Sequence, residues 1–379
     1  MSTNESTVSA RQMLADCHRI VIKVGSSLLT EPGVGLARDT IRRYCDEIAQ
    51  AGAMGKEILL VSSGAVAEGC TRLGWNERPD TIHELQAAAA VGQMGLAQAY
   101  ESGLAEHDIV TAIVMLTHDD VADRQRYLNA RATLTELGRL GVVPVINEND
   151  TVATDEIRFG DNDTLAALVA NLVEADLLVI LTDVEGLMDK DPGVHADAEL
   201  VHEANAQDKT LDELPSEAVG VLGRGGMVTK LKAARMAARS GAHTLIMSGH
   251  EPLTRIFAGE RVGTLLTADL TPITARKRWI AGQLRSSGTL NVDAGAAGAL
   301  KTQGVSLLAV GVVGVEGTFG RGDVVRIASP DGVTVAQGLS NYSSDEVRKL
   351  KGAKSDKFAD LIGYAGEPEL VHRDNLVVV

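Results

Sequence analysis

The sequence is poor in cysteine and in aromatic residues, and it has no long apolar run. Its 379 residues include only three cysteines, Cys17, Cys45 and Cys70, and 3% aromatic residues. An odd number of cysteines without a C-x-x-C pair argues against a disulfide framework. No apolar segment approaches the ~18 residues of a membrane helix, and MSTNESTVSARQ at the start lacks the pattern of a signal peptide. We therefore expect a cytoplasmic protein without a membrane partner.

Two common signatures of catalytic sites are also missing. None of the nine histidines has the spacing of a metal site. The Walker A pattern G-x-x-x-x-G-K-[ST] does not occur. The net charge of −15 argues against extensive binding of a polyanion, but it is compatible with a local phosphate site.

Apolar strand-like runs alternate with helical patterns over the first two thirds of the chain. The expected strands are 19–25, 57–64, 109–116, 142–146, 177–183 and 243–249. The expected helices are 39–50, 85–100, 124–140, 164–173 and 229–240. This alternation predicts an α/β domain with a mostly parallel sheet covered by helices. In such sheets, ligands bind beyond the carboxyl ends of the strands.

The pattern changes after residue 265, where short strands punctuated by glycine follow, such as GTLNVD and DVVRIAS. We expect a flexible tail at 1–17, the α/β domain at 18–265, a linker at 266–276 and a small β-rich domain at 277–379. The last domain is nearly balanced in charge, so the acidity of the chain lies mainly in the first.

Polar residues follow several of the predicted strands. In VIKVGSS, Lys23 and Gly25 offer a cation and a close backbone approach to a phosphate, although a lysine that reaches solvent from a strand end is the alternative. In VSSGAVAEG, Ser63 stands at the start of a helix, where it either helps to bind an anion or simply caps the helix.

Three further segments carry polar residues at positions where the sheet would bring them together. LTDVEGL ends a strand with Thr182 and Asp183, and LGRGGMVTK is a glycine-rich turn into a helix. Either segment alone is equally well explained as an ordinary turn or a flexible loop. GVVPVINENDTVATDEIRFGDNDTLAA, by contrast, gathers more carboxylates and amides after one strand than a turn needs.

Together, two lysines, glycine-rich loops and a carboxylate cluster predict phosphoryl transfer, which depends on positioning and charge neutralisation. Lys23 and Lys230 would contact the phosphates, and Asp163 would hold both ammonium groups. The remaining acidic and amide side chains would bind Mg²⁺ or a cationic part of the acceptor.

The chain resembles the glutamate 5-kinase family from about residue 18 to 376. The resemblance rests on VIKVGSS, VSSGAVAEG, AAVGQMGL, DRQRYLNAR, VPVINENDTVAT, GDNDTLAA, LLTDVEGL, GGMVTK, TARKRWI and VHRDN. DRQRYLNAR and VINEND distinguish it from acetylglutamate kinase, aspartokinase and uridylate kinase. The resemblance implies an amino-acid kinase three-layer sandwich with a mostly parallel sheet, followed by a PUA-like β-barrel.

The family's activity is ATP-dependent phosphorylation of the γ-carboxylate of L-glutamate to L-glutamyl 5-phosphate, the first step of proline biosynthesis. The resemblance also implies use of Mg²⁺, feedback inhibition by proline, a downstream glutamyl phosphate reductase and a homo-oligomer, either dimer or tetramer. An ionised γ-carboxylate needs no general base at neutral pH.

The resemblance assigns roles to residues of this sequence. The catalytic residues would be Lys23, Lys230 and Asp163. The glutamate site would contain Ser63 and Asn162 for carboxylate oxygens, Asp150 for the ammonium, and Asn147. The nucleotide site would contain Lys23, Gly25, Thr182, Asp183, Arg224, Gly225, Gly226, Met227, Val228, Thr229 and Lys230. Arg224 departs from the family, which usually has Thr there, and metal ligands are not indicated.

Two alternatives stay open. The PUA-like domain makes an RNA-binding regulator conceivable, but its balanced charge and few aromatic residues argue against it. A kinase for acetylglutamate or aspartate is the other alternative. The capped amine of acetylglutamate has no charge for Asp150 to pair with.

Overall fold

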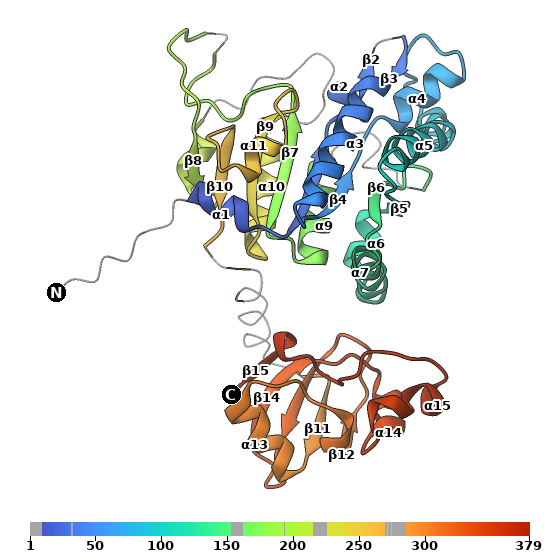
Figure 1. Cartoon of the computed structure of the whole chain (residues 1–379), viewed down its shortest axis with the longest axis vertical. Helices are drawn as coiled ribbons and strands as arrows, with labels where there is room; N and C mark the ends of the chain where they lie inside the picture. The colour runs from blue at the N-terminus through green and yellow to red at the C-terminus, as the bar shows by residue number, and fades with distance from the viewer. Residues whose placement is uncertain are drawn as a thin grey trace, which may run out of the picture. The chain divides into compact units, whose positions relative to one another are not determined.

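The computed structural model describes residues 10–31, 33–152, 162–192, 194–214, 226–269, 271, 274 and 286–379. The chain divides into two compact units, Met1–Pro272 and Ile273–Val379. Figure 1 labels the helices and strands of each unit.

An eight-stranded sheet forms the centre of the first unit (Figure 1). In spatial order, its strands are β5 (Thr111–Leu116), β6 (Val143–Glu148), β4 (Glu57–Val61), β1 (Arg19–Val24), β7 (Leu177–Thr182), β9 (His243–Ser248), β10 (Thr264–Thr267) and β8 (Glu203–Asn205). All neighbouring pairs are parallel except β9 and β10. The predicted mostly parallel sheet is confirmed, and β8 and β10 are additions to it.

Helices cover both faces of this sheet. Ile20 and Ile22 of β1 belong to one buried cluster, to which α3 (Arg38–Ala53) and α5 (Ile82–Ala105) contribute. Val21 belongs to a second cluster with α7 (Arg124–Arg139), α9 (Asn162–Val173) and α10 (Met227–Arg239). Alternate strand residues face opposite layers, so a strand covered on both sides reads as one continuous apolar run. The predicted three-layer sandwich is confirmed.

Short elements complete the first unit. They are α2 (Ser26–Leu29), β2 (Thr30–Glu31), β3 (Gly35–Leu36), α4 (Ala65–Arg72), α6 (His118–Ala122), η1 (Lys209–Asp212) and α11 (Thr254–Phe257). β2 and β3 pair antiparallel as a small hairpin.

The prediction of a flexible tail at 1–17 is wrong for its last part, because Ala10–Asp16 form helix α1. Leu14 is fully buried, and the Arg11 guanidinium donates to the carbonyl oxygens of His202, at 2.6 Å, and Gly263, at 2.9 Å. One buried leucine and one arginine bound to distant carbonyls leave no periodic pattern in the sequence. The predicted boundary at 265 is also wrong, since it cuts β10, and most of the predicted linker at 266–276 beyond β10 lies outside the described residues.

A five-stranded sheet forms the second unit. Its spatial order is β12 (Val312–Gly317), β11 (Gly288–Val292), β13 (Val324–Ala328), β14 (Thr334–Leu339) and β15 (Leu376–Val378). Its pairs are antiparallel except β11 with β13. The helical elements are α13 (Ala294–Gln303), η2 (Ala309–Gly311), α14 (Ser344–Leu350), η3 (Ser355–Lys357), α15 (Phe358–Ile362) and η4 (Arg373–Asn375). The unit has its own buried cluster, which includes Tyr342 and Phe358.

Glycines allow α4 and α5 to touch through their backbones. A Cβ atom on Gly92 of α5 would lie 1.8 Å from the carbonyl oxygen of Ala65, and one on Gly69 of α4 would lie 1.7 Å from that of Ala88. Real Cβ atoms never come so close to an oxygen. α4 begins directly after the Ser62–Ser63–Gly64 segment, so this contact fixes α5 against the carboxyl end of β4.

We predict that Gly92→Ala lowers the free energy of unfolding by about 1–3 kcal/mol, because the two backbones must separate. Gly52→Ala in α3 is the matched control, since a Cβ atom there meets nothing within 4 Å. Alanine at that helical position should leave stability unchanged or raise it by up to about 1 kcal/mol. Urea denaturation followed by circular dichroism measures both, and equal stability of the two variants would contradict the packing described.

Candidate active site

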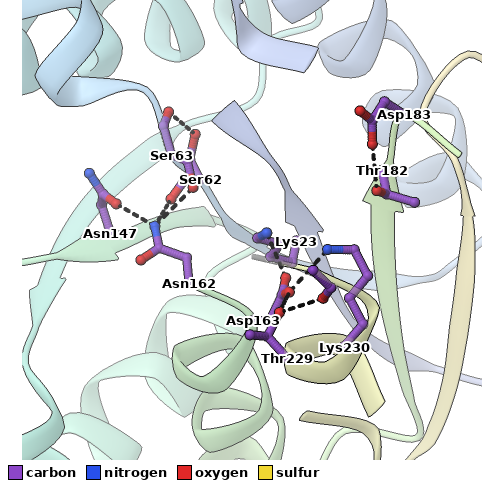
Figure 2. A network of polar contacts seen from close by, with 11 residues as sticks. Lys23, Ser62, Ser63, Asn147, Asn162, Asp163, Thr182, Asp183, Thr229 and Lys230 are labelled. Atoms are coloured by element: carbon purple, nitrogen blue, oxygen red, sulfur yellow. Dashed lines mark hydrogen bonds and ion pairs between the residues drawn. The ribbon is translucent and has the colours of Figure 1, made fainter. Parts of the chain in front are cut away.

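The predicted site residues gather at the carboxyl ends of the central strands. Lys23 lies near the end of β1, Ser63 follows β4, Asn147 lies near the end of β6, and Thr182 ends β7. Asn162 and Asp163 begin α9, and Thr229 and Lys230 lie in the first turn of α10. Figure 2 shows that Asp163 points at both lysines, while Asn162 points at Ser62 and Ser63, which follow β4, and at Asn147 of β6.

Asp163 links the two lysines through its two carboxylate oxygens (Figure 2). Lys23 Nζ lies 2.6 Å from Oδ1, and Lys230 Nζ lies 3.2 Å from Oδ2. The hydroxyl of Thr229 donates to Oδ2 at 2.8 Å. All three charged side chains are buried, with Asp163 at 0% exposure. Two positive charges therefore face one negative charge, and the surplus positive charge suits a bound phosphate.

The electrostatics of Asp163 follow from this arrangement. Burial raises the pKa of its carboxyl, but the charges of Lys23 and Lys230 outweigh burial, aided by hydrogen bonds from Lys23 and Thr229. The pKa falls from 3.8 to about 2 as a result. Asp163 is therefore a carboxylate at neutral pH, and it organises the lysines rather than exchanging protons.

A second polar cluster lies next to the first and consists of amides. Asn162 Nδ2 donates to the carbonyl oxygen of Ser62 at 2.6 Å, to Ser63 Oγ at 3.0 Å and to Asn147 Oδ1 at 3.0 Å. Asn147 Nδ2 donates in turn to Gln93 Oε1 at 2.8 Å. The expected role of Asn162 as a donor to a substrate carboxylate does not fit this arrangement, because protein oxygens already occupy its N–H groups.

The amide cluster borders a cavity of about 550 Å³. Ser63, Asn147, Asp150 and Asn162 all line it, as predicted for one binding pocket, together with Ser26, Ser27, Glu148, Trp75 and Arg78. A larger hollow of about 800 Å³ opens near the amino ends of β1, β4 and β6, and none of the predicted site residues lines it. The smaller cavity is therefore the candidate active site.

The remaining predicted residues lie around the lysine pair or beyond the described residues. The Thr182 hydroxyl donates to Asp183 Oδ1 at 3.1 Å at the end of β7. Gly25 precedes α2, and a Cβ atom there would come within 3.8 Å of Lys23 Nζ. Gly226 is the N-cap of α10 and provides no side-chain cap, so the amino end of this helix, which begins at Met227, can receive an anion. Arg224 and Gly225 lie outside the described residues.

Three residues near the site were not predicted, of which Ser62 and Glu148 are buried and Gln93 is partly buried. Gln93 belongs to the amide cluster, and Ser62 supplies the carbonyl oxygen at its centre. Glu148 is 2% exposed at the end of β6, and His118 Nδ1 lies 3.7 Å from its Oε2. The sequence signal for Gln93 is a glutamine after a glycine in an otherwise small and apolar helical stretch.

The described residues do not form a protein cage for a divalent metal ion. No group of three or more His, Cys, Asp or Glu side chains with metal-ligand geometry occurs in the part of the chain that the structure describes. Both oxygens of Asp163 already face lysines. Mg²⁺ often keeps several waters and binds mainly through substrate phosphates, which requires no such cage.

The chain matches two family models and close relatives. The model of the amino acid kinase family matches residues 18–248, and that of the PUA domain matches 288–362. A glutamate 5-kinase of Thioalkalivibrio sulfidiphilus is 59% identical over 97% of this chain and 99% of its own length. A glutamate 5-kinase of Pseudomonas fluorescens is 57% identical over 97% of this chain and 100% of its own. Among solved structures, a UMP kinase of Bacillus anthracis aligns at 19% identity with a TM-score of 0.48, covering 67% of this chain and 97% of that one.

We predict that Asp163→Asn lowers the free energy of unfolding at pH 7 by about 3–5 kcal/mol, because it leaves two buried lysines without their counter-charge. The pKa of the Asp163 carboxyl is depressed in the folded protein. The stability that its charge contributes is therefore fully present above the ordinary aspartate pKa of 3.8, and it is lost as the pH falls toward about 2. Urea denaturation between pH 3 and pH 7 measures this difference.

Asp197→Asn serves as the control, because this aspartate pairs with Lys190 at the surface and its side chain is 74% exposed. Its substitution should change stability by no more than about 1 kcal/mol. An Asp163→Asn protein as stable as the control at pH 7 would contradict the account of the lysine pair.

Proposed function

The chain belongs to the glutamate 5-kinase family of amino acid kinases, and we propose that it transfers the γ-phosphoryl group of ATP to the γ-carboxylate of L-glutamate. The observation that carries this proposal is the buried Asp163, which holds one lysine from β1 and one from α10 beside the cavity. The product would be L-glutamyl 5-phosphate, the first intermediate of proline biosynthesis.

The chemistry needs charge neutralisation more than proton transfer. An oxygen of the γ-carboxylate forms a bond to the γ-phosphorus, and the bond from that phosphorus to the oxygen bridging to ADP breaks. The acceptor is already ionised at neutral pH, so no base is required. Lys23 and Lys230 would stabilise the negative charge on the transferring group, and their burial strengthens that effect.

The acceptor would bind in the cavity beside the lysine pair. Asp150 supplies a carboxylate for the α-ammonium, and the Ser63 hydroxyl supplies a donor for a carboxylate oxygen. Asn147 and Asn162 line the same space. The cavity is lined by the acidic Asp150 and Glu148 and by the basic Arg78. Side chains of both charges suit a free amino acid better than an acceptor whose amine is capped.

The nucleotide would bind across the end of β7 and the amino end of α10. Thr182, Asp183 and Gly25 lie at the strand ends. The amino end of α10, where Gly226 provides no side-chain cap, can receive phosphate oxygens. Gly226, Met227, Val228 and Thr229 would contact these phosphates, and Arg224 and Gly225 would continue that loop. Mg²⁺ would be held chiefly by the phosphates of ATP, which agrees with the absence of a metal cage among the described side chains.

Regulation and assembly are proposed from the family alone. We expect proline to inhibit by binding at or near the glutamate cavity, a homo-oligomer of kinase domains, and a reductase that consumes the unstable product. The described residues contain no helix that is long and apolar enough to span a membrane. Cys17, Cys45 and Cys70 are all free and buried, which agrees with a reducing cytoplasm.

Trapping of acyl phosphate as the hydroxamate tests the function. The assay contains ATP, Mg²⁺ and hydroxylamine, with L-glutamate, N-acetylglutamate and L-aspartate supplied in parallel. We predict a signal with L-glutamate alone. A signal with another acceptor would contradict the role of Asp150, and no signal with any acceptor would overturn the proposed activity and favour an RNA-linked role instead.

The same assay tests the lysine pair with a matched control on one helix. Lys230→Ala should lower kcat by about 10²-fold or more, because one buried donor to the transferring phosphoryl group is lost. Lys232→Ala removes an exposed lysine two residues further along α10 and should keep full activity. A fully active Lys230→Ala enzyme would contradict the assigned role.

A further inference from the structure

The hairpin of β2 and β3 forms part of the wall of the candidate acceptor cavity. Thr30, Glu31, Gly33 and Gly35 line this cavity together with the residues of the amide cluster. The hairpin is a sheet of its own, in which Thr30 pairs with Leu36 and Glu31 with Gly35. A hairpin this short is at best marginally stable in water, so its contacts with other elements determine where this wall of the cavity lies.

A buried carboxylate on α4 binds the backbone of the hairpin. The N–H group of Leu36 donates to Glu68 Oε2 at 3.1 Å, and Glu68 is 4% exposed. Gly35 approaches the same oxygen, since a Cβ atom there would lie 2.7 Å from it, and the φ angle of +93° also favours glycine. Figure 1 shows β2 and β3 beside α4. Glu68 therefore ties β3 to α4.

Two arginines fix the direction of this carboxylate. Arg72 lies one turn further along α4, and its Nε atom donates to Glu68 Oε1 at 2.8 Å. Arg38 begins α3 just after β3, and its Nη2 atom lies 3.6 Å from the same oxygen. Gly95 leaves the space for this ion pair, because a Cβ atom there would lie 2.4 Å from Oε1. Glu68 is thus held where the hairpin, α4 and α5 meet.

The hairpin also contacts the segment that carries Ser63. A Cβ atom on Gly64 would lie 3.2 Å from Cγ2 of Thr30 and 3.4 Å from Cδ2 of Leu36. Gly64 is the N-cap of α4, and Ser63, directly before it, lines the cavity. A hairpin that is released from α4 would therefore move against Ser63 and alter the width of the cavity.

We propose that Glu68 is a positioning residue for the acceptor, which holds the β2–β3 hairpin in place as one wall of the glutamate cavity. This inference rests on the proposed function, because it assigns the residue that shapes the acceptor side of that site. Glu68 is not among the residues that line the cavity, so it acts through the hairpin. Removal of its carboxylate leaves the N–H group of Leu36 without its acceptor.

The test measures both KM values and kcat by hydroxamate trapping. We expect Glu68→Ala to raise the KM for L-glutamate about tenfold, because the displaced wall weakens binding of the acceptor. The KM for ATP and the kcat at saturating glutamate should stay within about twofold, since the proposed nucleotide contacts come from β1, β7 and α10. Neither KM value depends on the fraction of enzyme that is folded.

Glu47→Ala is the matched control for a purely structural role. Glu47 is 7% exposed on α3, accepts from Arg43 Nη1 at 2.8 Å and accepts from the N–H group of Leu253 at 2.9 Å. Neither Glu47 nor Leu253 lines the cavity. Both alanine variants should lower the urea midpoint of unfolding, but only Glu68→Ala should raise the KM for L-glutamate.

Two conservative variants identify the contact that matters. Glu68→Gln keeps an oxygen for the N–H group of Leu36, and its KM for L-glutamate should stay within about threefold of wild type. Glu68→Asp keeps the charge but withdraws the carboxylate from Leu36 by one methylene, and it should raise that KM about fivefold.

An unchanged KM for L-glutamate in both Glu68→Ala and Glu68→Asp would overturn the proposal. An equal rise in Glu47→Ala would also overturn it, since the effect would then follow from lost stability. Absence of glutamate phosphorylation by the wild-type chain would instead refute the proposed function and, with it, this role of Glu68.

Discussion

One buried carboxylate determines how the whole site is assembled. Asp163 begins α9 on one face of the sheet, and its two oxygens face a lysine from β1 and a lysine from α10. Three segments that are far apart in sequence are thereby tied together at the carboxyl ends of the strands. Burial of the three charged groups away from water costs free energy, and the attraction between the Asp163 carboxylate and the two ammonium groups offsets that cost. A further positive charge remains, and it is suited to a substrate phosphate.

The fold provides a rigid frame for this contact. β1 lies between β4 and β7 at the middle of the sheet, so Lys23 is fixed by parallel neighbours on both sides. β4 carries the Ser62–Ser63 segment and β6 carries Asn147, which places the amide cluster next to the lysine pair. Backbone contact through Gly69 and Gly92 then locks α4 and α5 at the same edge. The site therefore has two parts, the lysine pair at β1 and the amide cluster at β4 and β6, and the order of these strands in the sheet places the two parts side by side.

Sequence patterns predicted the parts of this site that depend on local signals. Lys23 interrupts an apolar strand, and Asn147, Asp150, Asn162 and Asp163 crowd one segment, so their convergence at a sheet edge was predictable. The orientation of Asn162 and the contact between Asn147 and Gln93 depend on hydrogen bonds across 15 to 100 positions of the chain, which no local pattern records. Helix α1 was missed for the same reason, because Arg11 binds carbonyls more than 190 positions away.

The central claim is that Asp163 holds both lysines where the phosphoryl group is transferred. A crystal structure with ADP, Mg²⁺, aluminium fluoride and L-glutamate tests it most directly. We predict that Nζ of Lys23 and Nζ of Lys230 each lie about 3 Å from the fluoride ligands or the nucleotide phosphate oxygens, with Asp163 still between them. A complex in which the fluoride group contacts neither lysine would contradict the account.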